Sequence, residues 1–490
     1  MKENSIKPHF GLKKIDILLI FFLILIGLVF RLYKIGNPVA DWHSWRQADT
    51  AAVARNFVRG GFDLLHPKYD DLGRNQTGLD NPQGYRFVEF PFYNSLFATL
   101  YKIYSGVSLE IYGRLTSIIF SLLIIAVIYI LLLYEDHQLS AFFGALVFAI
   151  MPFFIYYSRV ILPEMTALSL MFVSILLLYF WPGNFHKKKG WLFFSLSLIF
   201  GALALLVKPT TIFFLIPLIY IFIQKNGIYT LKKVSLYIFL ILVLLPTGLW
   251  RLWIQNFPQG VPASNWLISV VNTYEGPKNI FFRPAFFRWI FYERIPNLIL
   301  GSYLIFPLLL GFLKKPKKSW LIHSIALSSL VYLFTFQGGN VQHDYYQTLI
   351  LPSLAMLIGI GFGNIFHEKR LFSNQIFNIS TVIVILGFSF AFSYYKVKDY
   401  YSTDPNLIKI AKIVNTVTAS NVKIVTDRDG DTTLLYLADR KGVAAVYEDL
   451  SIFKNNGFKY FVTLHKEIAD EVKKQYKTIF ENDQVFIFKL

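Results

Sequence analysis

The sequence contains no cysteine, and only 16% of its 490 residues are charged. The absence of cysteine excludes a disulfide framework and any metal site built on thiolates. The charged fraction lies well below the roughly 25% that is usual for soluble domains. Acidic residues are fewer than basic ones: the sequence has 30 Asp and Glu against 48 Lys and Arg, which gives a formal net charge of +18. Such a balance indicates either a nucleic-acid partner or a membrane surface, and the positions of the charges decide between them.

Long apolar blocks dominate what the sequence does contain, with 55% hydrophobic residues, 18% aromatic residues and a mean hydropathy of +0.48. About 20 apolar residues cross the hydrocarbon core of a bilayer, and lipid leaves the backbone no hydrogen-bond partner outside a helix. We therefore predict an α-helical polytopic membrane protein. Eleven spans are expected, at residues 15–33, 111–133, 140–157, 163–181, 191–207, 210–223, 234–252, 297–313, 319–336, 346–366 and 376–394.

Lysine and arginine are distributed unevenly over the short loops between these spans. With a cytoplasmic N-terminus, basic loops such as 225–233 and 314–318 lie inside, and the outer short loops hold only Arg159 and Lys208. The positive-inside rule therefore predicts a multi-pass plasma-membrane protein with its N-terminus in the cytoplasm. Most of the excess positive charge lies in the inner loops, so we expect no nucleic-acid partner.

Three larger segments fall outside the membrane in this topology: residues 34–110, 253–296 and the tail. The tail alternates helix-like and strand-like runs, among them NLIKIAKIVNTV, VKIVTD and VFIFKL. We predict a transmembrane domain at 1–395, including the two outer loops, and a small extracytoplasmic α/β domain at 396–490. This second domain is expected to modulate acceptor binding or stability rather than to perform chemistry.

The tail also contains the acidic motif DRDGD at 427–431. An EF-hand calcium loop requires further ligands and a terminal Glu at fixed spacing, and these are missing. A strand-to-helix turn that is capped by Asp431 explains the motif better.

The stretch ADWHSWRQADTAAVARNF, residues 40–57, concentrates charged and aromatic side chains directly after the first span. One interpretation is a juxtamembrane amphipathic helix, capped by Asp49, with tryptophans in the membrane interface. Capping needs a single acid, which leaves Asp41, His43 and Arg46 unexplained. Ionisable side chains at a membrane boundary are costly and are therefore functional candidates.

Further ionisable residues occupy other outer ends of the predicted spans: Arg159 and Glu164 within 158–164, Lys208 within 205–211, and His343 and Asp344 within 342–346. Helix capping, snorkelling or a loop hydrogen bond explains each one alone. Together they are expected to converge with Asp41 and Asp49 on one cavity. Carboxylates beside cations suit transfer from a lipid phosphate, because a carboxylate takes the acceptor proton and cations stabilise charge on the leaving phosphate.

In these stretches the sequence resembles bacterial members of glycosyltransferase family 39. The motifs, in chain order, are DWHSWRQADTAAVARNF at 41–57, GYRFVEFPFYNSL at 84–96, SRVILPEMTALSLMF at 158–172, LLVKPTT at 205–211 and QHDYYQTLILP at 342–352. The resemblance covers roughly residues 10 to 395. It implies the GT-C fold and a sugar donor linked to polyprenyl phosphate, as in protein O-mannosyltransferases and the lipid A aminoarabinose transferase.

The resemblance also implies roles for individual residues. The catalytic base of the first outer loop corresponds to Asp41 or Asp49, which stay open because Trp42 replaces the second acid of the family's adjacent pair. A second acid, at the entry of the fourth helix, corresponds to Glu164. Basic residues near the donor phosphate correspond to Lys208, Arg46, His343 and Arg159, and contacts on the acceptor or substrate side to His43, Glu89, Asp344 and Tyr345.

We therefore predict a membrane glycosyltransferase that moves a hexose or pentose from polyprenyl phosphate to an acceptor hydroxyl at the outer face, with inversion at the anomeric carbon. The acceptor is a protein, a lipid or a glycan. A Mg²⁺ or Mn²⁺ ion held by Asp41 and Glu164 would suit their oxygen ligands, and the sequence leaves this ion open.

A transporter or flippase for a lipid-linked or anionic substrate is the alternative. Such a protein would carry ionisable residues near the middle of its spans and two related halves. Here the charges gather at the outer ends, and no internal repeat is evident. A silent relative that only binds a lipid-linked glycan is a third alternative, which an activity measurement separates from the enzyme.

Overall fold

The computed structural model describes residues 11–185, 188–264, 267, 284–368 and 372–490. The chain forms two compact units. The helical unit comprises residues 1–33, 115–250 and 264–399, and the mixed unit comprises 34–114, 251–263 and 400–490. Part of the predicted outer loop 253–296 lies outside the described residues, and the expected domain boundary at residue 395 stays a prediction.

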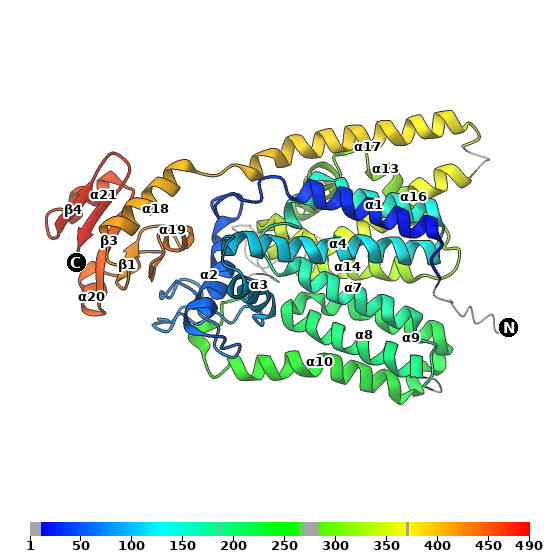
Figure 1. The fold of residues 1–490 in the computed structure, drawn as a ribbon, viewed down its shortest axis with the longest axis horizontal. Helices are drawn as coiled ribbons and strands as arrows, with labels where there is room; N and C mark the ends of the chain where they lie inside the picture. Colours follow the sequence, from blue (N-terminus) through cyan, green and yellow to red (C-terminus); the bar gives the residue numbers. More distant parts are fainter. Residues whose placement is uncertain (1–10, 186–187, 265–266, 268–283, 369–371) are drawn as a thin grey trace. The chain divides into compact units, whose positions relative to one another are not determined.

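The helical unit is built from helices that run side by side (Figure 1). Its first half contains α1 Lys14–Arg31, α4 Leu109–Glu135, α5 Gln138–Ile150, α6 Pro152–Tyr157, α7 Glu164–Phe180, α8 Lys188–Val207, η1 Pro209–Phe214, α9 Leu215–Asn226, η2 Gly227–Lys232 and α10 Val234–Ile254. Its second half contains α12 Pro284–Arg288, η5 Trp289–Ile299, α13 Ile305–Leu313, α14 Leu321–Thr335, α15 Gln337–Gln342, η6 Asp344–Ile350, α16 Leu351–His367 and α17 Gln375–Val397.

The apolar blocks of the sequence form these helices because a helix satisfies its own backbone groups. Among the described residues, six helical segments are long and apolar enough to cross a membrane, and α5, α7 and α14 are shorter apolar helices. The prediction of a mostly helical, multi-pass membrane protein agrees with this architecture. The number of eleven spans stays a prediction.

Small residues allow some of these helices to approach closely. A Cβ added at Gly311 of α13 would lie 1.8 Å from the carbonyl oxygen of Leu357, and one at Gly361 of α16 would lie 1.8 Å from that of Pro307. Helices in membranes associate largely through such close packing, since lipid supplies little hydrophobic drive between them. The contact between α13 and α16 therefore depends on glycine at both positions.

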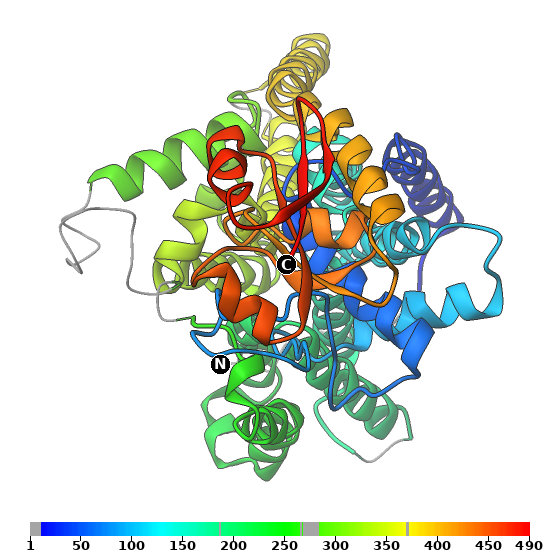
Figure 2. The same ribbon diagram turned by 90° about the vertical axis from the view of Figure 1, so that its left-hand side faces the viewer.

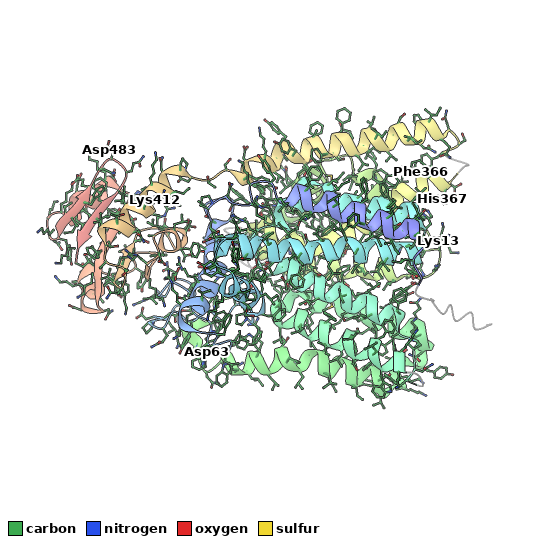
Figure 3. The ribbon with its side chains drawn as sticks, viewed as in Figure 1. Lys13, Asp63, Phe366, His367, Lys412 and Asp483 are labelled. Atoms are coloured by element: carbon green, nitrogen blue, oxygen red, sulfur yellow. The ribbon has the colours of Figure 1, made fainter. Side chains whose placement is uncertain are left out.

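Several loops that are expected on one side of the membrane gather at one end of the helical unit. Lys13, before α1, and His367, at the end of α16, lie at this end in Figure 3. The Nζ atom of Lys314 is 3.1 Å from the carboxylate of Asp136, and the backbone amide of Gly11 donates a hydrogen bond to the hydroxyl of Tyr134 (2.9 Å). The assignment of this end to the cytoplasm stays a prediction.

The mixed unit begins with the first predicted outer loop, which forms α2 Ser44–Gly60 and α3 Phe92–Ile103. The expectation that Asp49 caps the first helix is wrong, because α2 starts five residues earlier, at Ser44. His43 precedes it in the left-handed conformation, with φ of 54°. Asp49 lies inside the helix as a buried side chain, so its carboxylate serves tertiary contacts rather than the helix end.

The tail adds helices α18 Pro405–Val417, α19 Thr433–Leu437, α20 Leu450–Asn455 and α21 Lys466–Val472, and strands β1 Lys423–Thr426, β2 Lys441–Val443, β3 Phe458–Thr463, β4 Lys477–Glu481 and β5 Phe486–Lys489. They form the orange to red part of Figure 2. The strand order is β2-β1-β3-β5-β4. Strand β1 pairs in parallel with β2 and β3, whereas β5 pairs antiparallel with β3 and β4.

The DRDGD motif forms the turn between β1 and α19. The N-cap residue of α19 is Thr432 rather than the predicted Asp431. Asp431 lies one residue earlier, and its carboxylate accepts a hydrogen bond from the backbone amide of Thr433 (2.8 Å). Gly430 has φ of 90° and Asp429 has φ of 48°. These left-handed residues reverse the chain after the strand.

Candidate functional site

Asp41 is one of the two acids proposed as the base, and its side chain is buried at 4% exposure. The side-chain amide of Gln47, on the first turns of α2, donates a hydrogen bond to its Oδ1 atom (2.7 Å). On the following residue, the ring of Trp42 stacks on Tyr400 with centroids 4.8 Å apart, and its amide donates to the carbonyl of Tyr400 (3.1 Å). A helix and an aromatic stack therefore fix the backbone around Asp41.

Arg46, on the same turn of α2, forms a buried ion pair with Glu89. A second guanidinium nitrogen donates to the hydroxyl of Thr50 (3.3 Å). His43, immediately before the helix, is partly exposed and packs edge-on against Trp42 at 5.1 Å. The structure thus places four of the predicted residues, namely Asp41, His43, Arg46 and Glu89, on or beside the first turns of one helix in the mixed unit.

Asp49 occupies a denser network. Its carboxylate lies 2.8 Å from a guanidinium nitrogen of Arg86 and accepts hydrogen bonds from the Thr432 hydroxyl (2.7 Å) and the Gln76 amide (3.4 Å). We call Asp49 with these three partners the Asp49 cluster. A buried carboxylate requires such donors because burial removes its hydration. Of the two candidate bases, Asp49 therefore has an evident structural role.

Asp71 lies near the Asp49 cluster and is also buried. Its Oδ1 atom accepts a hydrogen bond from the backbone amide of Gly73 (2.8 Å). Burial is the largest cause that raises the pKa of Asp71 to about 7, and the charge of Asp49 adds to this effect. Between about pH 4 and 7, the folded protein therefore keeps a proton on Asp71 that the unfolded chain has released.

This difference predicts how stability depends on pH. Between about pH 4 and 7 the folded state binds more protons than the unfolded state, so stability falls as the pH rises through this window. An amide mimics the protonated acid, and Asp71→Asn should therefore raise the thermal unfolding midpoint by several degrees at pH 8 and leave it unchanged at pH 4. The same change at the exposed Asp483 is the control, and a shift of Asp71→Asn that is equal at both pH values contradicts the prediction.

In the helical unit, Glu164 and Lys208 form an ion pair. The Nζ atom of Lys208 lies 2.7 Å from Oε1 of Glu164, and the two side chains are 11% and 3% exposed. Glu164 is the first residue of α7, where the helix dipole favours an anion. Lys208 precedes η1 in an extended conformation. The pair places a largely buried cation at a helix end.

The segments that follow Lys208 and His343, η1 and η6, both contact α7. Asp344, which begins η6, accepts a hydrogen bond from the hydroxyl of Tyr157 (2.5 Å) and lies 3.5 Å from a guanidinium nitrogen of Arg294. The rings of His343 and Tyr345 stack at 5.4 Å. Asp344 thus links three segments, and His343 is partly exposed whereas Asp344 is buried.

Arg159 is fully buried, and a guanidinium nitrogen donates to the backbone carbonyl of Tyr33 (3.0 Å). Arg31, which the sequence reasoning did not select, is also fully buried. It donates to the carbonyls of Phe148 and Ala149 (both 2.9 Å) and to the Ser158 hydroxyl (2.7 Å). Both arginines therefore satisfy backbone carbonyls where α1 and the α5–α6 segment end.

Sequence reasoning missed the residues that hold the candidate acids and cations in place. They are Gln47, Arg86, Gln76 and Thr432 in the mixed unit and Tyr157 and Arg294 in the helical unit. Arg86 stands inside the quoted 84–96 motif, so its charge next to the selected Glu89 was the available signal. The sequence around the other five residues contains no motif that indicates which acid each of them contacts.

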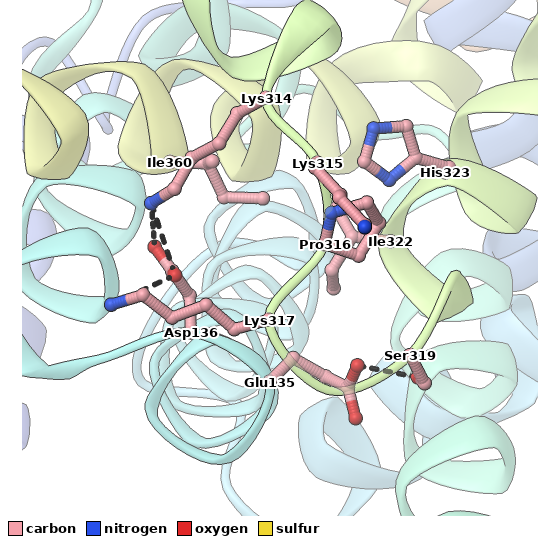
Figure 4. Close-up of a pocket in the computed structure, with 10 residues that line it drawn as sticks. All are labelled: Glu135, Asp136, Lys314, Lys315, Pro316, Lys317, Ser319, Ile322, His323 and Ile360. Carbon is pink, nitrogen blue, oxygen red and sulfur yellow. Dashed lines mark hydrogen bonds and ion pairs between the residues drawn. The ribbon is translucent and has the colours of Figure 1, made fainter.

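A small hollow of about 280 Å³, including space open to solvent, lies at the end of the helical unit that carries Lys314 and Asp136. Figure 4 shows Lys314 and Lys317 directed at Asp136, and Ser319 hydrogen-bonded to Glu135. None of its lining residues belongs to the predicted site. It lies where α4 ends, whereas the Glu164–Lys208 pair lies where the parallel helix α7 begins.

The sequence indicates Asp41 and Glu164 as possible ligands of a divalent metal ion. Among the residues that the structure describes, no group of three or more His, Asp or Glu side chains is arranged to hold a metal ion. The carboxylate of Glu164 faces the ammonium group of Lys208, which is a poor neighbour for a second cation. A Mg²⁺ or Mn²⁺ site with these ligands stays a prediction.

Comparison with known proteins identifies the fold. A family model described as dolichyl-phosphate-mannose-protein mannosyltransferase matches residues 90–253, about a third of the chain. No curated protein matches by sequence. The matched region includes Glu164 and Lys208, and it starts one residue after Glu89.

Solved structures match over nearly the whole chain. ArnT from Cupriavidus metallidurans, bound to undecaprenyl phosphate, matches with a TM-score of 0.65 at 14% identity, over 96% of this chain and 97% of that one. The oligosaccharyltransferase AglB from Archaeoglobus fulgidus, in complex with an inhibitory peptide and a dolichol-phosphate, matches with a TM-score of 0.58 at 13% identity, over 92% and 69%. The arabinofuranosyltransferase AftD from Mycobacteria matches with 0.53 at 13% identity, over 94% and 37%.

The chain therefore has the fold of membrane glycosyltransferases of the GT-C type, and the fold that the sequence resemblance implied is confirmed. The match to ArnT includes the tail as well as the helices, because it covers 96% of the chain. At identities of 14% and below, the likeness to these structures shows the fold.

Proposed function

We propose that this protein is an integral-membrane glycosyltransferase that moves a sugar from a polyprenyl-phosphate donor to an acceptor hydroxyl at the outer face of the membrane. The observation that carries the proposal is the match along almost the whole chain to ArnT, a protein solved with bound undecaprenyl phosphate. The partial match to a mannosyltransferase family model and the likeness to AglB, solved with a dolichol-phosphate, support the same class of donor.

The residues suit a direct displacement with inversion. Asp41 takes the proton of the acceptor hydroxyl, and the acceptor oxygen attacks the anomeric carbon. The bond from this carbon to the phosphate oxygen breaks, and its electron pair leaves with polyprenyl phosphate. Phosphate departs without a general acid, because its negative charge is stable in water at neutral pH. Gln47 donates a hydrogen bond to Oδ1 of Asp41, which orients the carboxylate.

Lys208 is proposed to stabilise the leaving phosphate. A cation that is fixed before the reaction stabilises charge that develops in the transition state without reorganisation. Glu164 holds the Lys208 ammonium group at 2.7 Å and so keeps it ready for an anion. His343 is proposed as a further phosphate contact, since it lies one residue from η6, which packs on α7. Arg46 and Arg159 remain candidates for the same role, although each has an internal partner.

The acceptor side is assigned to the mixed unit. His43 and Glu89 lie beside the turn that carries Asp41, where a hydroxyl has to approach its base. Asp344 and Tyr345 stay candidates for contacts with the substrate. A hexose and a pentose fit this chemistry equally well.

The test is transfer of radiolabelled sugar from native lipid extract to endogenous acceptors, in membranes with and without the protein. The proposal expects label in the acceptor and release of one polyprenyl phosphate for each sugar transferred. Movement of the intact lipid-linked sugar across vesicles without cleavage would instead identify a flippase. Binding of the lipid without either process would identify a silent relative.

A further inference from the structure

The tail and the first loop pair with each other within the mixed unit. The backbone amide of Leu72 donates to the carbonyl of Gly442 (2.7 Å), and the amide of Gly442 donates to the carbonyl of Asp70 (3.0 Å). Gly442 belongs to β2, the edge strand of the sheet. The loop therefore covers an edge that would otherwise expose unpaired backbone groups.

Charged side chains strengthen this junction. Arg55 of α2 is ion-paired with Asp70 and lies 3.1 Å from Asp439, and it also donates to the carbonyl of Tyr436 (2.8 Å). Arg59, one turn further along α2, makes two bonds of 2.8 Å to the two carboxylate oxygens of Asp439. A bidentate arginine–carboxylate pair fixes orientation as well as distance. Tyr436 and Asp439 of the tail thus bind two arginines of α2.

The start of α19 continues the same contact to the candidate acids. The Thr433 hydroxyl lies 2.9 Å from that of Ser44, the first residue of α2. The Thr432 hydroxyl donates to Oδ1 of Asp49 (2.7 Å) and lies 3.3 Å from the carbonyl of Trp45. Thr432 is 2% exposed. Its hydroxyl therefore ties the tail to the helix turns between Asp41 and Asp49.

From this geometry we infer that the C-terminal domain holds residues 41–49, the segment that carries both candidate bases, in the position that catalysis requires. In this inference Thr432 is a positioning residue. The inference rests on the proposed function and adds a role for the tail to it. Thr432 acts through Asp49, which lies on the second turn of α2, the helix that follows Asp41. Loss of its hydroxyl removes a hydrogen bond to a buried carboxylate, an interaction stronger than one between two neutral groups. The first turns of α2 are then held less firmly against the tail.

The test compares Thr432→Val with Thr432→Ser and with Thr463→Val in the full-length protein. The last variant is a matched control, because Thr463 is a buried threonine of the same domain whose hydroxyl donates to Asp427, remote in sequence from α2. Thr432→Val should lower kcat about tenfold or more and leave KM for the lipid donor unchanged, since it disturbs the base rather than donor binding. Thr432→Ser should restore kcat, and Thr463→Val should behave as wild type.

Amide hydrogen exchange of α2 supplies a readout that does not require activity. Thr432→Val should speed exchange in residues 44–60, whereas Thr463→Val should not. An unchanged kcat with unchanged exchange in Thr432→Val overturns the inference, as does an equal loss in Thr463→Val. A wild-type protein that transfers no sugar contradicts the proposed function instead, and the exchange result then still decides whether the tail holds the loop.

Discussion

Replacement of Asp41 by Asn should lower the rate of sugar transfer by about 10³-fold, within the range of 10² to 10⁴ that general base catalysis contributes. Asn keeps the shape of the side chain and accepts the hydrogen bond from Gln47, but it cannot take the acceptor proton. The fold should therefore survive, with a thermal midpoint close to that of wild type. The measurement is initial transfer per folded molecule at matched expression.

Asp49→Asn is the comparison that identifies the base. Asp49 lies against the guanidinium group of Arg86 at 2.8 Å, and removal of its charge leaves a buried arginine without its counter-ion. Breaking such a pair is strongly destabilising. We expect Asp49→Asn to lower the thermal midpoint and to reduce transfer mainly through loss of folded protein. Full activity of Asp41→Asn together with loss in a well-folded Asp49→Asn would assign the base to Asp49.

Replacement of Lys208 by Met should reduce transfer by about 10² to 10³-fold, the usual effect of removing one group that stabilises developing negative charge. The single change also leaves Glu164 buried without its partner, which alone destabilises the protein. The double variant Lys208→Met with Glu164→Gln removes both charges and should restore stability. Transfer by the double variant, measured with its thermal midpoint, then reports the phosphate role of Lys208.

The two explanations for Lys208 give opposite results in that double variant. If Lys208 stabilises the leaving phosphate, the double variant folds and remains inactive. Recovery of the wild-type rate would mean that Lys208 serves only as the counter-ion of Glu164. Lys208→Arg is the charge-preserving control, and it should keep part of the activity, because a guanidinium retains the charge but differs in shape.

Local patterns in the sequence were sufficient to predict a mostly helical membrane protein and the start of α7. Apolar runs predict helices because lipid permits little else, and Glu164 after Pro163 marks the start of α7 correctly. The start of α2 was misjudged, because Asp49 in the sequence has the form of a helix cap. In the structure the helix begins at Ser44 after a left-handed His43, a conformation that no local propensity predicts.

The contacts of the candidate site were beyond the reach of local patterns. Thr432 and Asp49 are 383 residues apart in the chain, and Tyr157 and Asp344 are 187 apart. Periodicity and motif spacing describe neighbours within a few turns, so they cannot pair such residues. Local patterns could not predict the strand order of the tail either, because the antiparallel placement of β5 between β3 and β4 depends on tertiary packing.

The pairing of residues 70–72 with Gly442 also bears on how the protein is made. A ribosome delivers the first loop hundreds of residues before the strand that covers it, and chains fold from the N-terminus as they emerge. Until β2 arrives, Leu72 and Asp70 lack their backbone partners and Asp49 lacks the Thr432 hydroxyl. A nascent chain that is still in translation therefore forms its first helices before Asp49 has its Thr432 partner. Under the proposed function, we expect sugar transfer only after the C-terminal domain has been synthesised.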